Sequence, residues 1–227
     1  MSAPTSSDAT TPRFARFFNN LELIVAILLG LIAITTAYAS FQAALYDSQM
    51  AGAYNVGNAQ ATEAESLYLE GNQQFLQDTQ VFNQLSLLQV RIATGDALAQ
   101  EEYDTLYFQG VSEEFGAAID RAAAQTESDP EFFYSPLDDE DYQNYLFSPW
   151  SEMKDSSIAT IKNGDEFNNR SDKLTLYTVL MSVSLFLLGI AALVRQRRTQ
   201  LVLMGTGVVI SLVAIIMTAM VPFVGLG

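Results

Sequence analysis

Residues 174–194 read LTLYTVLMSVSLFLLGIAALV and contain no charged side chain. A helix needs about 20 predominantly apolar residues to cross the hydrocarbon core of a bilayer. Two further runs have the same character: residues 21–38, whose only charge is Glu22, and residues 201–224, which carry none. A buried helix of a water-soluble protein rarely runs this long without a charge. The sequence therefore predicts an all-α integral membrane protein with three transmembrane helices.

Basic residues predict how these helices are oriented, because short cytoplasmic segments are enriched in Lys and Arg. Five arginines flank the apolar runs, two before the first run and three between the second and the third: Arg13, Arg16, Arg195, Arg197 and Arg198. The expected topology in the cell membrane places the N-terminus in the cytoplasm. The long segment between the first two runs and the C-terminus are then both outside.

The expected domain organisation follows from the same runs. Residues 1–17, rich in Ser, Thr and Ala, are expected to form a disordered cytoplasmic tail. The other segments are transmembrane helix 1 (18–44), an extracytoplasmic helical domain (45–173), transmembrane helix 2 (174–194), a cytoplasmic basic turn (195–200) and transmembrane helix 3 (201–224). Ala37-Tyr38-Ala39 also fits a signal-peptidase site, but the apolar run before it is longer than a usual signal core. An uncleaved anchor is therefore the preferred interpretation.

The segment 45–173 is strongly acidic, with 24 Asp and Glu against 6 Lys and Arg. Such a surface repels nucleic acid, so no nucleic-acid partner is expected. A solvated acidic coat suited to concentrated salt is preferred over a specific cation site. The acidic run Asp138–Asp141 lacks the glycine and the closing glutamate of an EF-hand loop, so a solvated loop is expected there.

The chain contains no cysteine and no histidine. Thiol nucleophiles, Ser–His–Asp triads and zinc sites built on Cys or His are therefore excluded. No nucleophile–base pair can be assembled from the remaining residue types, so neither a catalytic residue nor a metal ligand nor a cofactor is predicted. The protein is not expected to be an enzyme.

A seven-residue spacing runs through residues 54–85 and predicts a long, coiled-coil-like helix in the acidic segment. Its two rows alternate large aromatic with small residues, as closely packed helices do: Tyr54, Ala61, Tyr68, Phe75 and Phe82 form one row, and Gly57, Ala64, Gly71, Asp78 and Leu85 form the other. Asp78 interrupts the second row. A second helix is expected over about 97–125, an irregular excursion over 128–150 and a third helix over about 150–173.

Small and hydroxyl residues recur at helical spacing within two of the apolar runs: Gly30, Ala33, Ala37 and Ser40 in the first, and Thr175, Thr178 and Ser182 in the second. Such residues let transmembrane helices approach closely, so helix packing is the preferred interpretation. A pore-lining stripe in an oligomer is the alternative. No ionisable residue beyond Glu22 lies within a run, which disfavours an ion-coupled transporter.

Several short motifs resemble a family of uncharacterised prokaryotic three-span membrane proteins. They are Ala39–Ala43 (ASFQA), Asn58–Ala64 (NAQATEA), Asn168–Asp172 (NNRSD), Thr178–Leu180 (TVL), Phe186–Ile190 (FLLGI), the arginine turn and Pro222. The match is specific around residues 39–66 and 166–223 and fades between about 95 and 150. The resemblance implies one span, an outer helical domain and a closing two-span hairpin. It implies no activity.

These features favour a non-enzymatic membrane protein, a structural or accessory subunit that uses its outer helices for self-association or for binding a partner complex. The expected partners are the lipid bilayer and either further copies of the chain or another membrane complex. A small homo-oligomeric ion channel lined by hydroxyl residues of the second span is one alternative. A membrane sensor of external ions is another.

Overall fold

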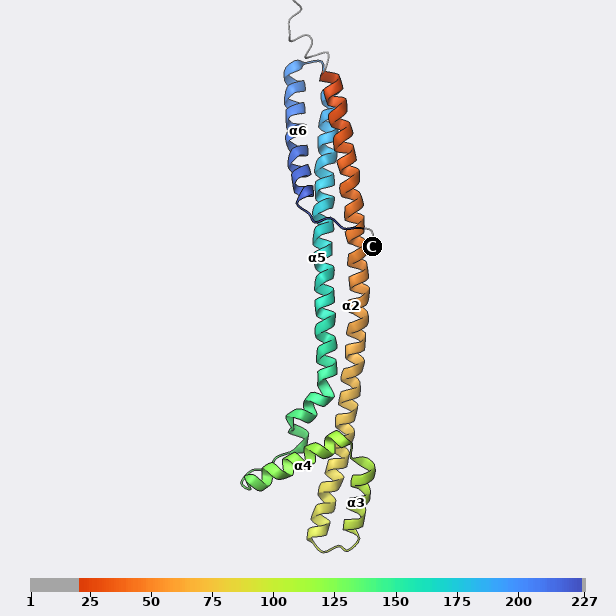
Figure 1. Ribbon diagram of the computed structural model, residues 1–227, viewed down its shortest axis with the longest axis vertical. Helices are drawn as coiled ribbons and strands as arrows, with labels where there is room; N and C mark the ends of the chain where they lie inside the picture. Colours follow the sequence, from red (N-terminus) through yellow and green to blue (C-terminus); the bar gives the residue numbers. More distant parts are fainter. Residues whose placement is uncertain (1–20, 226–227) are drawn as a thin grey trace, which may run out of the picture. The chain divides into compact units, whose positions relative to one another are not determined.

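A computed structural model describes residues 21–225, which are helical wherever they have regular secondary structure. The elements are α2 (Leu21–Ala93), α3 (Ala99–Gly110), α4 (Glu113–Ser128), the 3-10 helix η1 (Pro136–Asp138), α5 (Glu140–Leu193) and α6 (Arg197–Ala219) (Figure 1). Helices α2, α5 and α6 are each long and apolar enough to cross a membrane. The prediction of an all-helical chain with three candidate spans is confirmed. The tail expected at 1–17 lies outside the described residues.

The chain divides into two compact units. The described part of one unit comprises residues 21–52 and 163–225. It is called the apolar unit here, because it contains the apolar stretches of α2 and α5 and all of α6. The other comprises residues 53–162 and is called the middle unit. It contains the remaining parts of α2 and α5 together with α3, α4 and η1.

In the apolar unit, α2, α5 and α6 pack around one hydrophobic cluster, and α6 runs back beside α5 (Figure 1). Buried residues recur at every seventh position: Val25, Ile32, Ala39 and Tyr46 on α2, and Leu174, Met181 and Leu188 on α5. Only 17–28% of the most apolar window of each span is buried inside the chain. The remaining apolar side chains need lipid or another protein around them.

In the middle unit, α4 and the first turns of α5 pack against α2. The core consists of Phe115, Ala118, Tyr142 and Leu146, with Phe75 and Phe82 of α2 among the half-buried side chains around it. This aromatic core fixes the surfaces that are described below.

The single helix expected over about 97–125 is wrong, because the structure has two helices there. Gly110 is the last residue of α3, and Val111 after it is extended. Ser112 is also extended, and its side chain accepts a hydrogen bond from the Phe115 amide, so it caps the start of α4. Glycine weakens the end of one helix and serine is a favourable N-cap for the next.

The irregular region expected over 128–150 is also partly wrong, because α5 begins at Glu140. Asp139 accepts a hydrogen bond from the Tyr142 amide and so caps this start. Pro149 lies inside the helix. Proline removes one intrahelical hydrogen bond, the bond to the carbonyl of Tyr145, without ending the helix here.

Candidate functional site

The predicted row Gly57, Ala64, Gly71, Asp78 and Leu85 is buried along its whole length. Glycine is needed at two of these positions. A Cβ atom on Gly71 would lie 2.6 Å from the backbone oxygen of Leu146, and one on Gly57 would lie 2.6 Å from Cγ1 of Ile161. Helices α2 and α5 therefore approach each other closely at both glycines. At Gly57 the hydroxyl of Ser157 also donates a hydrogen bond to the glycine carbonyl.

The other predicted row lies at the edge of this contact rather than inside it. Phe75 and Phe82 pack against the middle core, and the Phe82 ring meets Phe115 edge to face with centroids 6.3 Å apart. Tyr68 contacts the rings of Phe147 and Trp150. The other two members of the row, Tyr54 and Ala61, are half-buried.

Asp78, which interrupts the small-residue row, forms a buried polar contact between α2 and α5. Its carboxylate accepts a hydrogen bond from the Tyr142 hydroxyl at 2.6 Å and two from the Gln74 amide at 3.0 and 3.1 Å. Burial, and then the neighbouring carboxylate, raise the pKa of Tyr142 far above its ordinary value, so the phenol remains a donor. The contact is satisfied and has no open side for a substrate.

Arg121 of α4 and Asp139 before α5 form a two-bond ion pair. The Nε–Asp139 Oδ2 distance is 2.9 Å, and Nη2 donates to the second oxygen. The hydrogen bond from Arg121 holds the pKa of Asp139 below its ordinary value, assisted by the Tyr142 amide. Asp139, from the acidic run expected to be a solvated loop, therefore fastens α4 to the start of α5.

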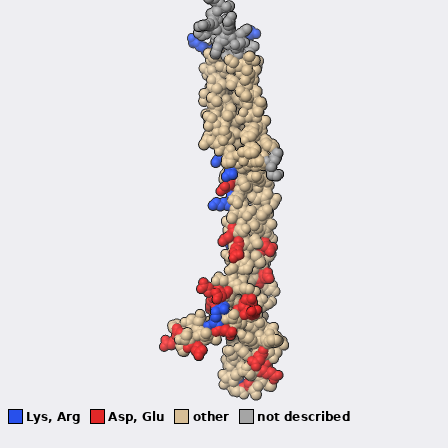
Figure 2. Space-filling view, in the orientation of Figure 1, with Lys and Arg blue, Asp and Glu red and all other residues tan. Residues whose placement is uncertain are grey.

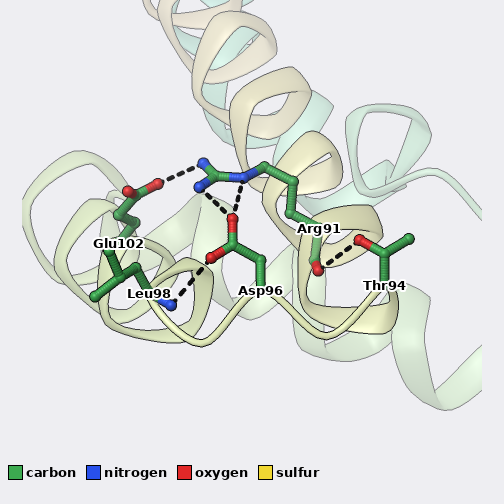
Figure 3. Close-up of polar contacts among 5 residues, drawn as sticks. All are labelled: Arg91, Thr94, Asp96, Leu98 and Glu102. Carbon is green, nitrogen blue, oxygen red and sulfur yellow. Dashed lines mark hydrogen bonds and ion pairs between the residues drawn. The ribbon is translucent and has the colours of Figure 1, made fainter.

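A second arginine closes the turn between α2 and α3 (Figure 3). Arg91 donates to Asp96 at 2.6 Å and to Glu102 at 2.6 Å, and Asp96 in turn accepts from the Leu98 amide at 3.1 Å. The hydrogen bond from Arg91 lowers the pKa of Asp96. Gly95 has a positive φ of 89°, which the turn requires. These exposed pairs shape the turn and leave no base beside a nucleophile.

An apolar cleft with a volume of about 540 Å³ opens between α2, α4 and the segment that precedes η1. Phe82, Ile119 and Ala122 line its wall, and Phe133 and Pro136 line its other side. The volume is within the range of small-molecule and side-chain pockets. The sequence placed Ile119 on the apolar face of the helix expected over about 97–125 and Phe133 among the aromatic residues of the excursion expected over 128–150. It did not indicate that the two line one cleft.

In the apolar unit, the predicted stripe on α2 does not face the other spans. Gly30, Ala33, Ala37 and Ser40 are all exposed on the chain, and a Cβ on Gly30 would meet nothing within 4 Å. The face of α2 that packs against α5 is the row from Val25 to Tyr46. A packing role for the predicted stripe therefore requires a second protein molecule and stays a prediction.

The predicted stripe on α5 is likewise directed mainly outward. Thr175 and Ser182 are exposed and Thr178 is half-buried. The hydroxyls of Thr178 and Ser182 each donate to a carbonyl of their own helix, at 2.7 and 2.8 Å. Each hydroxyl proton is therefore used within the helix, whereas the oxygen can still accept a hydrogen bond. The pore hypothesis stays a prediction.

Different hydroxyls join the helices of the apolar unit. Buried Ser184 of α5 donates to the carbonyl of Gly207 on α6, and buried Ser171 donates to the carbonyl of Ala43 on α2 at 3.2 Å. Interhelical hydrogen bonds of this kind stabilise helix association in membranes. Ser171 belongs to the series of hydroxyl residues that recurs at helical spacing with Thr175, Thr178 and Ser182, whereas the sequence did not distinguish Ser184 from its neighbours.

The segment after α6 is fastened to α2. Buried Gln42 accepts a hydrogen bond from the Val224 amide at 2.9 Å and donates to its carbonyl at 3.2 Å. The hydroxyl of Tyr46 donates to the Pro222 carbonyl at 2.7 Å. The signal for this contact in the sequence is the polar side chain of Gln42 shortly after the first apolar run.

Three of the five arginines on which the predicted topology depends lie within the described residues. Arg195 lies between α5 and α6, and Arg197 and Arg198 are the first residues of α6, so the helix starts inside the turn expected over 195–200. All three are exposed. Arg13 and Arg16 lie outside the described residues.

Among residues 21–225, no three carboxylates are grouped closely enough to hold a metal ion. Comparisons with protein-family models, curated proteins and solved structures found no match for the chain. The resemblance to a three-span membrane family therefore stays a prediction.

Proposed function

We propose that this chain is a non-enzymatic membrane subunit that assembles through its helical middle unit, with further copies of itself or with a partner membrane complex. The observation that supports this proposal is a row of leucines on α2: Leu69, Leu76 and Leu87, each more than half exposed. Their spacings of 7 and 11 residues are close to two and three helical turns, so they lie along one side of the helix.

This row lies on the side of α2 opposite the buried residues Gly71, Asp78 and Leu85, because two residues correspond to about 200° around a helix. The middle part of α2 thus packs one side against α5 and carries three exposed leucines, with Gln73, Gln80 and Asn83 between them, on the opposite side. Exposed leucines repeated along one side of a helix are typical of a seam between helices. The coiled-coil-like character of the middle unit belongs to this proposal.

The test is the mass of the purified full-length protein in mild detergent, measured by light scattering and by crosslinking. We expect an oligomer or a copurifying partner for the native chain, and loss of that assembly in L69Q/L76Q/L87Q. Glutamine keeps helix propensity while removing the apolar side chains. The matched control is L98Q, which removes an equally exposed leucine outside the row. A monomer without a partner, or a triple variant that assembles normally, contradicts the proposal.

For orientation, we propose that the arginine turn is cytoplasmic and that the middle unit and the C-terminus are outside. The chain lacks cysteine, so single cysteines report position without background. A membrane-impermeant maleimide applied to intact cells is expected to label Ala97→Cys and to leave Thr199→Cys unlabelled until the cells are lysed. The reverse labelling pattern rules out this topology.

We propose that the acidic surface of the middle unit suits it to concentrated salt. Residues 53–162 contain 20 Asp and Glu against 4 Lys and Arg, and two of the four bases are in the ion pairs described above. Salt screens repulsion among the other carboxylates. Thermal unfolding of the middle unit in the full chain should shift upward as KCl rises from 0.1 to about 2 M. An unchanged or lowered midpoint contradicts this adaptation.

A further inference from the structure

The apolar cleft beside Phe133 continues into a second hollow of opposite character. This hollow shares Ala122, Phe133 and Tyr134 with the cleft. Its remaining lining is largely acidic, with Asp138, Asp139, Glu140 and Asp141 around Arg121. The surface therefore changes from apolar to acidic across the Phe133 side chain. Carboxylates also dominate the charged residues of this unit in the space-filling view (Figure 2).

The charges of the acidic hollow are only partly neutralised within the chain. Arg121 is bound by Asp139, and Asp141 lies 3.8 Å from its Nε. Asp138 and Glu140 are both exposed to solvent. An approaching cation would therefore meet negative potential beside an apolar cleft.

Phe133 itself is suited to contact a partner. It is 76% exposed although its ring is large and apolar. The backbone around it is held, because the Tyr134 amide donates to Thr126 at 3.4 Å and the Tyr134 hydroxyl donates to Asp129 at 3.3 Å. An exposed aromatic on a held backbone is typical of a binding anchor, since little conformational freedom is lost on binding.

We infer that this surface binds a cationic amphipathic helix of a partner protein. Apolar side chains of that helix enter the cleft lined by Phe82, Ile119 and Phe133, and its Lys or Arg side chains face Asp138 and Glu140. Charge complementarity selects this occupant over a neutral apolar ligand or another copy of the acidic middle unit, which the same carboxylates would repel. The inference rests on the proposed assembly function and names one class of partner for it.

The test uses full-length protein in nanodiscs of zwitterionic phosphatidylcholine. The probe is a fluorescent synthetic helix of about 18 residues with leucine on one side and lysine on the other. The matched probe has glutamate in place of lysine, and empty nanodiscs give the lipid background. We expect the lysine helix to bind at least about tenfold more tightly than the glutamate helix, with an affinity that falls as salt rises.

Variants separate this site from general attraction to an acidic protein. F133S should weaken binding of the lysine helix about tenfold, and D138N/E140Q should weaken it and reduce its salt dependence. The control is F108S, which removes an exposed phenylalanine of α3 that does not line the cleft. Circular dichroism is used to check that F133S is folded. I119S is a second variant of the cleft and should also weaken binding of the lysine helix.

Equal binding by F133S and F108S, or equal binding of the two probes, overturns the inference. The result is distinct from failure of the assembly proposal. L69Q/L76Q/L87Q should lose self-association but keep binding of the lysine helix, whereas F133S should do the reverse.

Discussion

The apolar unit and the middle unit use the same spacing of buried residues but join their helices by different contacts. In both, α2 buries residues at every seventh position, from Val25 to Tyr46 in one and from Gly57 to Leu85 in the other. Both units also contain buried serines that donate to a carbonyl of a neighbouring helix, Ser171 and Ser184 in the apolar unit and Ser157 in the middle unit. The middle unit adds glycine contacts and an aromatic core around an Asp–Tyr pair.

The difference follows from the surroundings that each unit is expected to have. Lipid chains are as apolar as leucine, so association of helices in a membrane depends on packing and on interhelical hydrogen bonds. In water, burial of apolar surface provides the main stabilisation. The middle unit accordingly has an aromatic core, whereas the apolar unit is expected to depend on helix packing and interhelical hydrogen bonds. The predictions below test this contrast.

The largest effect is expected for G71A. The added Cβ would lie 2.6 Å from the backbone oxygen of Leu146, and a backbone atom cannot turn aside as a flexible side chain can. We expect a loss of about 3 kcal/mol in the stability of the middle unit, the upper part of the range for overpacking. Hydrogen exchange of the α2 amides in the full chain measures it.

The matched control is G52A on the same helix, where a Cβ would meet nothing within 4 Å. Alanine favours a helix interior over glycine by up to about 1 kcal/mol, so this change should be neutral or stabilising. Equal effects of the two substitutions would mean that α2 and α5 do not approach each other at Gly71.

The buried rows of α2 also explain why the sequence predicted the packed side of the middle unit better than that of the apolar unit. Between residues 54 and 85, most positions are polar, so recurring small and aromatic residues are distinct from their neighbours. In the first apolar run almost every residue is apolar, and periodicity cannot identify the packed side. The stripe from Gly30 to Ser40 was chosen for small size, whereas the packed face contains large and small residues alike.

Contacts distant in sequence could not be predicted at all. From the sequence, Asp78 only interrupted its row of small residues. Its hydrogen-bond donor Tyr142 lies 64 residues away, in a region that was expected to be irregular. The cleft beside Phe133 depends on the same misassigned region. Helix breaks there are set by single caps, Ser112 and Asp139, which are common residue types without a unique signal.

The next largest effect is expected for Y142F, which removes a donor from the buried Asp78 carboxylate. Gln74 remains as the partner of that carboxylate. A hydrogen bond to a charged group contributes about 1.5–3 kcal/mol, so we expect a loss of about 2 kcal/mol in the middle unit. Limited proteolysis at increasing urea concentration measures the change. Y145F, a change at a 56% exposed tyrosine nearby, should have almost no effect, and equal losses for the two would contradict the buried contact.

A smaller effect is expected for S184A in the apolar unit. This substitution removes the hydrogen bond to the Gly207 carbonyl. Interhelical hydrogen bonds between membrane helices average about 0.6 kcal/mol and reach about 1.7, so the loss should be below that of Y142F. Unfolding of the full chain by increasing fractions of SDS in mild detergent measures it.

Ser182 provides the control, since its hydroxyl is exposed and donates within its own helix. S182A should leave the unfolding transition unchanged. A larger loss for S182A than for S184A would favour a packing role of the outward hydroxyl stripe over the contact between α5 and α6.

The smallest effect is a pH dependence at the partly exposed Arg121–Asp139 pair. The folded-state pKa of Asp139 is below its ordinary value of 3.8, chiefly through the hydrogen bond from Arg121. A depressed carboxyl pKa stabilises the folded state fully above the ordinary value, and this contribution disappears as pH falls through the folded-state pKa. The stability difference between the native chain and D139N should therefore be constant from pH 7 to about 5 and shrink below about pH 4.

Thermal unfolding at each pH measures this stability difference. D138N is the control, because Asp138 is an exposed neighbour outside the described ion pair. If the difference for D139N does not shrink in acid, or D138N follows the same curve, then general repulsion among carboxylates rather than this pair governs the acid response of the middle unit.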